Sequence, residues 1–259
     1  MESLRQRFIP NIKKESIIKL LETNKRDDER GLLDFREIKA KLGIINNANG
    51  SAQVHLGNTI VTVGVKVEPG NPFPDEPDKG VLMVNSEFPP VASPDFEPGP
   101  PDENAIELAR VVDRGIRESK FIKLEELAII PGQKVWVIWV DIYVLNHDGN
   151  LIDASGIATI LALMNTKIPK TTIEAGGIKL LDEKYPLPLR NPPIYMTYIK
   201  LNNKILLDPS LDEELISDTR LTLTITSDNM ICAMQKGGKG TFTLEDISCL
   251  LYTSPSPRD

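Results

Sequence analysis

One stretch limits the possible folds more than any other: "KVWVIWVDIYVLN", residues 134–146. It is apolar at nearly every position and rich in β-branched and aromatic residues, whereas a strand with one face in water alternates apolar and polar side chains. The stretch therefore predicts a central strand covered on both faces. The turn "HDGN" follows it, and "LIDASGIATILALMNT" at 151–166 then predicts a buried helix, because its small residues allow close approach to a sheet.

Strand and helix patterns occur in two successive halves of the chain. In the first half, 11–23 predicts a short amphipathic helix, 50–68 a β-hairpin turning at Gly57-Asn58-Thr59, and 81–88 a strand after a proline-rich loop. In the second half, "PIYMTYIKLNNKILLDPS" and "TRLTLTITSDNMICAMQKGGKGTFT" predict antiparallel strands joined by Asn-Asn and Asp-Asn turns. No boundary between independent domains is visible. We therefore predict one α+β domain over residues 1–248, with two strand-then-helix halves and mixed sheets packed on central helices.

Composition excludes several classes of protein. With 259 residues, 41% of them hydrophobic and 26% charged, the chain is large enough for a substantial core and is neither disordered nor fibrous. The net charge of −7 excludes general polyanion binding, so any contact with nucleic acid requires a local basic patch. There is no apolar run long enough to span a membrane and no secretory leader, which predicts a cytoplasmic protein. Cys232 and Cys249 are expected to be reduced thiols, and no metal site or cofactor is expected.

Residues 103–120, "ENAIELARVVDRGIRESK", predict an amphipathic helix that begins after an N-cap at Asp102. One face is apolar, and Arg110, Arg114 and Arg117 fall together on the opposite face. These arginines have two interpretations. They could be a solvated surface that pairs with the nearby acids Glu103, Glu107 and Asp113, or they could be a focused binding site for an anion.

Several stretches resemble the RNase PH family. "RDDERGLLDFREI" is similar to the family's N-terminal Arg-x-Asp-Gly-Arg segment, with Glu29 in place of the usual glycine, and "GSAQVHLGNTIVTVGV" is similar to its first hairpin. "FEPGPPDENAIELARVVDRGIRESK", "VWVIWVDIYVLNHDGN" and "KGGKGT" resemble one branch more closely, the catalytically silent ring subunits of archaeal exosomes. The resemblance spans about residues 8–248. It implies the RNase PH fold and an alternating heterohexameric ring with a catalytic RNase PH-like partner, RNA-binding cap subunits and single-stranded RNA.

The resemblance also implies roles for particular residues. Active family members present a Gly-Gly-Thr/Ser-Arg segment to phosphate after the central strand, where this chain has Gly149 followed by Asn150, Leu151, Ile152 and Asp153. The hydroxyl and the arginine are absent, so these positions are expected to form a degenerate phosphate site. Active members also carry two aspartates six residues apart, and Asp212 and Asp218 have that spacing here. Without a phosphate pocket they are expected to be retained acids with no catalytic use, and to cap nearby backbone amides instead.

The implied function is that of a non-catalytic subunit that binds and positions RNA through Arg110, Arg114 and Arg117 and supports 3′-to-5′ phosphorolysis by its partner. Inorganic phosphate would be used at the partner's site. The alternative is a catalytically active RNase PH-like exoribonuclease, and a third possibility is a module that only holds the ring together. At the C-terminus, Thr243 is expected to cap a truncated helix, and 249–259, which include "TSPSPRD", are expected to form a disordered or non-native tail.

Overall fold

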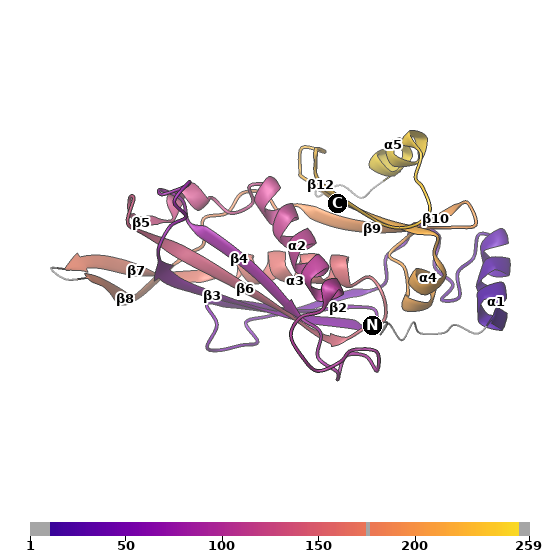
Figure 1. Ribbon diagram of the computed structural model, residues 1–259, viewed down its shortest axis with the longest axis horizontal. Helices are drawn as coiled ribbons and strands as arrows, with labels where there is room; N and C mark the ends of the chain where they lie inside the picture. Colours follow the sequence, from indigo (N-terminus) through magenta and orange to yellow (C-terminus); the bar gives the residue numbers. More distant parts are fainter. Residues whose placement is uncertain (1–10, 175–176, 254–259) are drawn as a thin grey trace.

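The computed structural model describes residues 11–174 and 177–253 and divides them between two sheets and a separate hairpin (Figure 1). The first sheet has the strand order β1-β2-β3-β6-β4, with β5 also paired to β6. Its members are β1 (Ile38–Leu42), β2 (Gly50–Leu56), β3 (Thr59–Gly70), β4 (Val81–Glu87), β5 (Ala128–Ile130) and β6 (Lys134–Asn146). β4 runs parallel to β6 while the other pairs are antiparallel, so the predicted mixed sheet is confirmed.

The second sheet is antiparallel, with the order β10-β9-β11-β12. Its strands are β9 (Ile194–Leu201), β10 (Lys204–Leu207), β11 (Thr219–Ile225) and β12 (Ile231–Gly238). The predicted Asn-Asn turn joins β9 to β10, where both asparagines adopt positive φ, and the Asp-Asn turn joins β11 to β12. The short helix α4 (Leu211–Ile216) lies between β10 and β11 and is closed by a reciprocal Ser210/Glu213 capping box.

Two helices lie between the sheets, as expected. α2 (Glu103–Glu118) begins at the predicted N-cap, where the Asp102 carboxylate accepts a hydrogen bond from Ala105 N at 2.8 Å. α3 (Leu151–Met164) packs on β2 and β3 of the first sheet and on β9 of the second. The side chain of Tyr195 lies between both helices, because a Cβ added at Gly115 or Gly156 would come within 2.4 Å of its ring or hydroxyl. These glycines therefore make room for the tyrosine.

The central strand is confirmed as β6, but its expected burial on both faces is only half right. The core-facing side chains, from Trp136 to Val144, are buried against the helices. On the other face, Val135 and Val137 pack in a small cluster with Val81, whereas Tyr143 and Leu145 are 39% and 40% exposed. The outer face is thus covered at one end of the strand and open at the other.

Helices lie near both ends of the part of the chain that the structure describes. α1 (Asn11–Glu22) buries Ile17 and Leu21 against the second sheet. α5 (Leu244–Thr253) begins at the predicted cap, where Thr243 Oγ1 accepts from Asp246 N at 3.0 Å. This helix continues to Thr253 and so includes residues 249–253 of the expected tail. The rest of the expected tail, 254–259, lies outside the described residues.

A third sheet was not predicted. β7 (Lys167–Glu174) and β8 (Gly177–Pro186) form an antiparallel hairpin at the opposite end of the molecule from α1, as Figure 1 shows. Pro169 and the charged residues of this segment interrupt the alternation that marks a strand. β1 and β5, the 3-10 turn Leu124–Glu126 and α4 were also not predicted, because they are too short to show a period.

Candidate functional site

The three arginines of α2 form one exposed surface, here called the arginine face: Arg110, Arg114 and Arg117. The opposite side of the helix carries the predicted apolar residues, and all of them are buried. Burial of that side fixes the rotation of α2 and so turns the arginines to solvent.

The arginines differ in what they contact. Arg117 is held by an ion pair with Asp113 at 2.8 Å and by a hydrogen bond to the Leu82 carbonyl at 3.1 Å. Within the described residues, Arg110 and Arg114 have no ion-pair partner. Glu107 does not pair with them; it accepts hydrogen bonds from Arg220 and Gln235 in the second half. Of the arginine–acid pairs considered from the sequence, the one between Arg117 and Asp113 is present among the described residues.

The expected degenerate phosphate site lies at the start of α3. Asn150 is the N-cap, in the left-handed conformation with φ of +53°, and its backbone N–H donates to Glu214 Oε1 at 3.0 Å. Leu151 and Ile152 begin the helix, and Ile152 is buried. Gly149 has φ of +86°, and a Cβ there would lie 2.4 Å from Leu211 N. This close approach of the loop to α4 brings Glu214 to the amide.

Behind this loop, Asp208 is fully buried and contacts two arginines and an asparagine. Its carboxylate accepts hydrogen bonds from Arg36 Nη2 at 2.8 Å, Arg30 Nη1 at 3.1 Å and Asn150 Nδ2 at 2.6 Å. Burial acts to raise the pKa of Asp208, but the hydrogen bonds and charge of Arg36 outweigh burial and hold that pKa below its ordinary value. Next to it, the buried pair Arg26 and Glu213 is joined by two hydrogen bonds. The RDDER segment therefore anchors the chain beneath α4.

Two other carboxyl groups near the loop have pKa values above their ordinary range. Burial raises the pKa of Asp153 to about 6, although hydrogen bonds from Asn150 and Thr197 oppose the shift. Burial likewise raises the pKa of Glu214 to about 7, against the opposing charges of Arg220 and Arg36 and the bond from Asn150 N. Asp153 also links the two halves, because it accepts from the backbone and hydroxyl of Thr197 on β9 at 2.8 and 2.7 Å.

The raised pKa of Glu214 predicts how stability depends on pH. The folded protein binds a proton here more tightly than the unfolded chain, so the free energy of unfolding falls as pH rises from about 4.5 to about 7. The free energy of unfolding lost from this group is on the order of 3 kcal/mol. Glu214→Gln removes this titrating group. The variant is expected to show a flatter pH dependence of urea unfolding between pH 5 and 7 and a higher stability than the parent chain at pH 8. An unchanged pH profile would contradict the assignment.

A pocket of about 250 Å³ opens in front of the α3 N-terminus and is here called the α3 pocket. Its polar lining includes Glu107, Glu214 and Arg220, and Arg220 Nη2 donates to Glu107 Oε1 at 2.9 Å. Its apolar lining comes from α3, α4 and the loop before α2, and includes Phe88 and Phe96, whose rings stack with centroids 4.8 Å apart.

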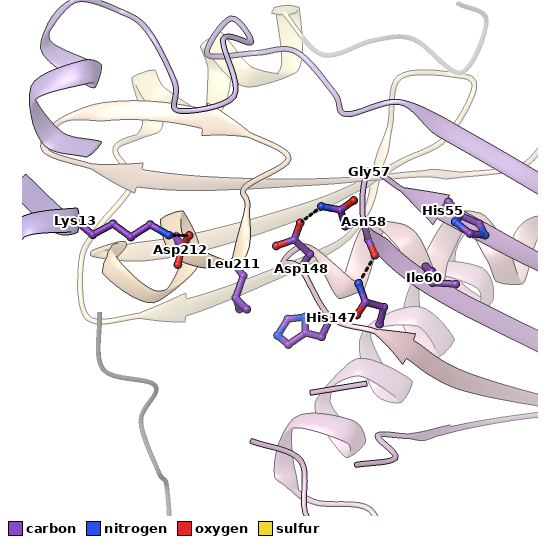
Figure 2. Close-up of a pocket in the computed structure, with 10 residues that line it drawn as sticks. Lys13, His55, Gly57, Asn58, Ile60, His147, Asp148, Leu211 and Asp212 are labelled. Carbon is purple, nitrogen blue, oxygen red and sulfur yellow. Dashed lines mark hydrogen bonds and ion pairs between the residues drawn. The ribbon is translucent and has the colours of Figure 1, made fainter. Parts of the chain in front are cut away.

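Asp212 and Asp218 lie outside the α3 pocket. Asp212 lines a separate, more polar hollow of about 520 Å³, where it pairs with Lys13. Figure 2 shows this pair on one side of the hollow, with His55 and Asn58 on the other. Asp218 is exposed just before β11. The expected capping of backbone amides by these two side chains is not observed among the described residues, where Ser210 and Glu213 cap α4.

The pair that lines the α3 pocket was missed from the sequence. Glu214 and Arg220 are also six residues apart, two positions further along than the chosen aspartates. The capping box of Ser210 and Glu213 is a readable signal for a helix start at Leu211 and could have placed Glu214 in its first turn. Among the described residues, no cluster of metal-ligating side chains and no helix long and apolar enough to cross a membrane is found.

Family models match both halves of the chain. The 3′ exoribonuclease family (RNase PH), domain 1, matches residues 34–169, and domain 2 of the same family matches residues 191–251. The chain therefore belongs to the 3′ exoribonuclease family, which confirms the resemblance to RNase PH.

Relatives with similar sequences are exosome components. The exosome complex component Rrp42 of Thermococcus kodakarensis is 53% identical over 92% of this chain and 88% of its own length. That of Pyrococcus horikoshii is 51% identical over 95% of this chain and 91% of its own length.

Similar solved structures place the fold in the same group. A chain of the Archaeoglobus fulgidus exosome with RNA bound to the active site has a TM-score of 0.86 and 48% identity, covering 93% of each chain. A chain of an archaeal exosome core has a TM-score of 0.82 and 45% identity, covering 93% of this chain and 91% of that one. Both confirm the predicted RNase PH fold.

Proposed function

We propose that this chain is a non-catalytic ring subunit of an archaeal-type exosome in the cytoplasm. It alternates with a catalytic RNase PH-like subunit in a heterohexameric ring that also carries RNA-binding cap subunits. In this ring it binds single-stranded RNA and supports the partner's active site during 3′-to-5′ phosphorolysis. The observation that carries the proposal is the arginine face, with Arg110 and Arg114 unpaired among the described residues, in a chain about half identical to exosome components.

The chemistry of the arginine face fits RNA phosphates. A guanidinium donates two parallel hydrogen bonds to a phosphate and keeps its charge at any physiological pH. Contacts to phosphate carry no sequence information, which suits a complex that degrades many RNAs. The mass of the complex formed on mixing the chain with a candidate catalytic subunit tests whether the ring forms. Crosslinking of RNA to this subunit within the ring separates RNA binding from a purely structural role.

The alternative, an RNase PH-like enzyme that acts by itself, is disfavoured by residues 150–153. They offer neither a hydroxyl nor an arginine for phosphate, and Asp153 adds a buried carboxyl group beside the loop. The proposal requires that the purified chain alone release no nucleoside diphosphates from RNA in the presence of phosphate. No cofactor is invoked, and the phosphate is consumed at the partner's site.

Asp212→Asn and Asp218→Asn in this subunit are expected to change phosphorolysis by the ring less than about twofold. Asp212 pairs with Lys13 outside the α3 pocket and Asp218 is exposed, so neither lies where a reaction at this loop would need it. The rate of nucleoside diphosphate release is the measurement. If Asp218→Asn abolished most of the activity of an intact, RNA-binding ring, the enzyme alternative would gain and the proposal would fail.

A further inference from the structure

Arg110, the first residue of the arginine face, has an acidic residue about one helical turn away on either side. Glu107 precedes it by three positions and Asp113 follows it by three, and side chains three apart on a helix are neighbours that can form ion pairs. Within the described part of the chain, neither acid pairs with Arg110, which is exposed. What the two carboxylates contact instead therefore decides whether Arg110 is free.

Each acid is bound by a different cation. Asp113 pairs with Arg117 at 2.8 Å on α2 itself. Glu107 Oε1 accepts hydrogen bonds from Arg220 Nη2 at 2.9 Å and from Gln235 Nε2 at 3.1 Å. These two donors lie on β11 and β12 of the second sheet, so the Glu107 carboxylate faces the sheet.

The two donors lie close to the arginine face. Gln235 and Arg114 line one small hollow between α2 and the second sheet. The pair between Arg220 and Glu107 is partly exposed, with 28% and 36% of the two side chains accessible, so it adds little to stability. It does fix the direction of the Glu107 carboxylate, and this direction decides whether the negative charge lies beside Arg110 or beside the sheet.

We propose that Arg220 and Gln235 are positioning residues for RNA binding, because they hold the Glu107 carboxylate away from Arg110 and keep that guanidinium free for a phosphate. Without them, Glu107 would pair with Arg110 across one helical turn and cancel its charge toward the RNA. The inference rests on the proposed function and deepens it, since it names residues in the second half of the chain that control the arginine face. They act through Glu107 and need no contact with RNA.

The test is RNA binding by the assembled ring, measured by fluorescence anisotropy over a range of salt concentrations. Arg220→Ala is expected to weaken binding by about three- to tenfold and to lower the slope of log affinity against log salt by up to about 0.7, the value of one phosphate contact. Arg220→Ala/Glu107→Gln is expected to restore both quantities, because glutamine cannot neutralise Arg110. Arg220→Lys keeps the charge and should stay within about twofold of the parent ring.

Two comparisons test whether the effect depends on Arg110. In a ring that already carries Arg110→Ser, Arg220→Ala should lower the slope no further, because the contact that it controls is already lost. Arg190→Ala is the matched control, since it removes an arginine from an exposed ion pair with Glu125, outside the arginine face. This control should leave both the affinity and the slope unchanged.

Unchanged RNA binding by an intact ring that carries Arg220→Ala overturns the inference. A loss that Glu107→Gln does not restore also overturns it, since Arg220 would then contact RNA itself. If Arg220→Ala does not assemble, Gln235→Leu with and without Glu107→Gln decides by the same criterion. The proposed function fails by a different result, namely unchanged RNA binding by an intact ring that carries Arg110→Ser/Arg114→Ser, so the two failures are distinguishable.

Discussion

Replacing Arg110 and Arg114 with serine is expected to weaken RNA binding by the assembled ring and to lower its salt dependence. Both guanidinium groups are exposed and unpaired among the described residues, so they are available to phosphates. Each phosphate contact to a single strand contributes about 0.7 to the slope of log affinity against log salt, so the slope should fall by about 1.4. The affinity itself should fall by about 10- to 100-fold. Fluorescence anisotropy with a labelled RNA over a range of salt concentrations measures both quantities.

Arg117 provides an internal comparison. Its ion pair with Asp113 and its bond to the Leu82 carbonyl already use part of the guanidinium, so adding Arg117→Ser should lower the slope by less than a full further contact. A full decrease, to about 2 in total, would show that Arg117 leaves Asp113 when RNA binds. The control is Lys14→Ser/Lys19→Ser, which removes two exposed cations on α1, a helix distant in sequence from the arginine face. An unchanged slope in the arginine variant, with the ring intact, would make the arginine face an ordinary solvated surface.

Asp208→Ala is expected to lower the free energy of unfolding by about 3–5 kcal/mol, the range typical of a buried ion pair that loses one partner. The Asp208 side chain is fully buried, and its removal leaves the guanidinium groups of Arg36 and Arg30 and the amide of Asn150 without their shared acceptor. Urea denaturation of the isolated chain at pH 7 measures the effect. The loop at the start of α3 should also become less ordered, because Asn150 connects it to Asp208.

Asp212→Ala is the matched control, since it removes an aspartate from the same segment. Its pair with Lys13 is solvent-exposed, so its loss should cost less than about 1 kcal/mol. Comparable losses for the two variants would show that the Asp208 cluster does not anchor the loop.

Long elements were predictable because their patterns repeat. The helix 103–118 shows its buried face at i, i+3 and i+4, and the strand 134–146 was found with both of its ends correct. Caps were also readable, since Asp102 and Thr243 both accept the hydrogen bonds expected of them. These features depend on interactions between residues close in sequence, which a linear pattern records.

The candidate site was harder to predict because it depends on contacts distant in sequence. Asp208 is one of 37 acidic residues, and nothing local distinguishes the one that will be buried among arginines from residues 30 and 36. The spacing of two aspartates led to Asp212 and Asp218, whereas Glu214 and Arg220 line the α3 pocket. Glu214 reaches the start of α3 because Gly149 approaches Leu211 closely, a contact between residues distant in sequence. The arginine face lay on a regular helix and was therefore located correctly, while its binding partner remains a prediction.

Tyr195 connects the two halves of the fold. Its hydroxyl donates to the Val112 carbonyl at 2.7 Å, midway along the helix segment between Arg110 and Arg114. The residue belongs to β9, so this hydrogen bond ties α2 directly to the four-stranded sheet. If RNA binds the arginine face as proposed, it contacts a helix that is fixed to both halves by a tyrosine that is itself 1% exposed.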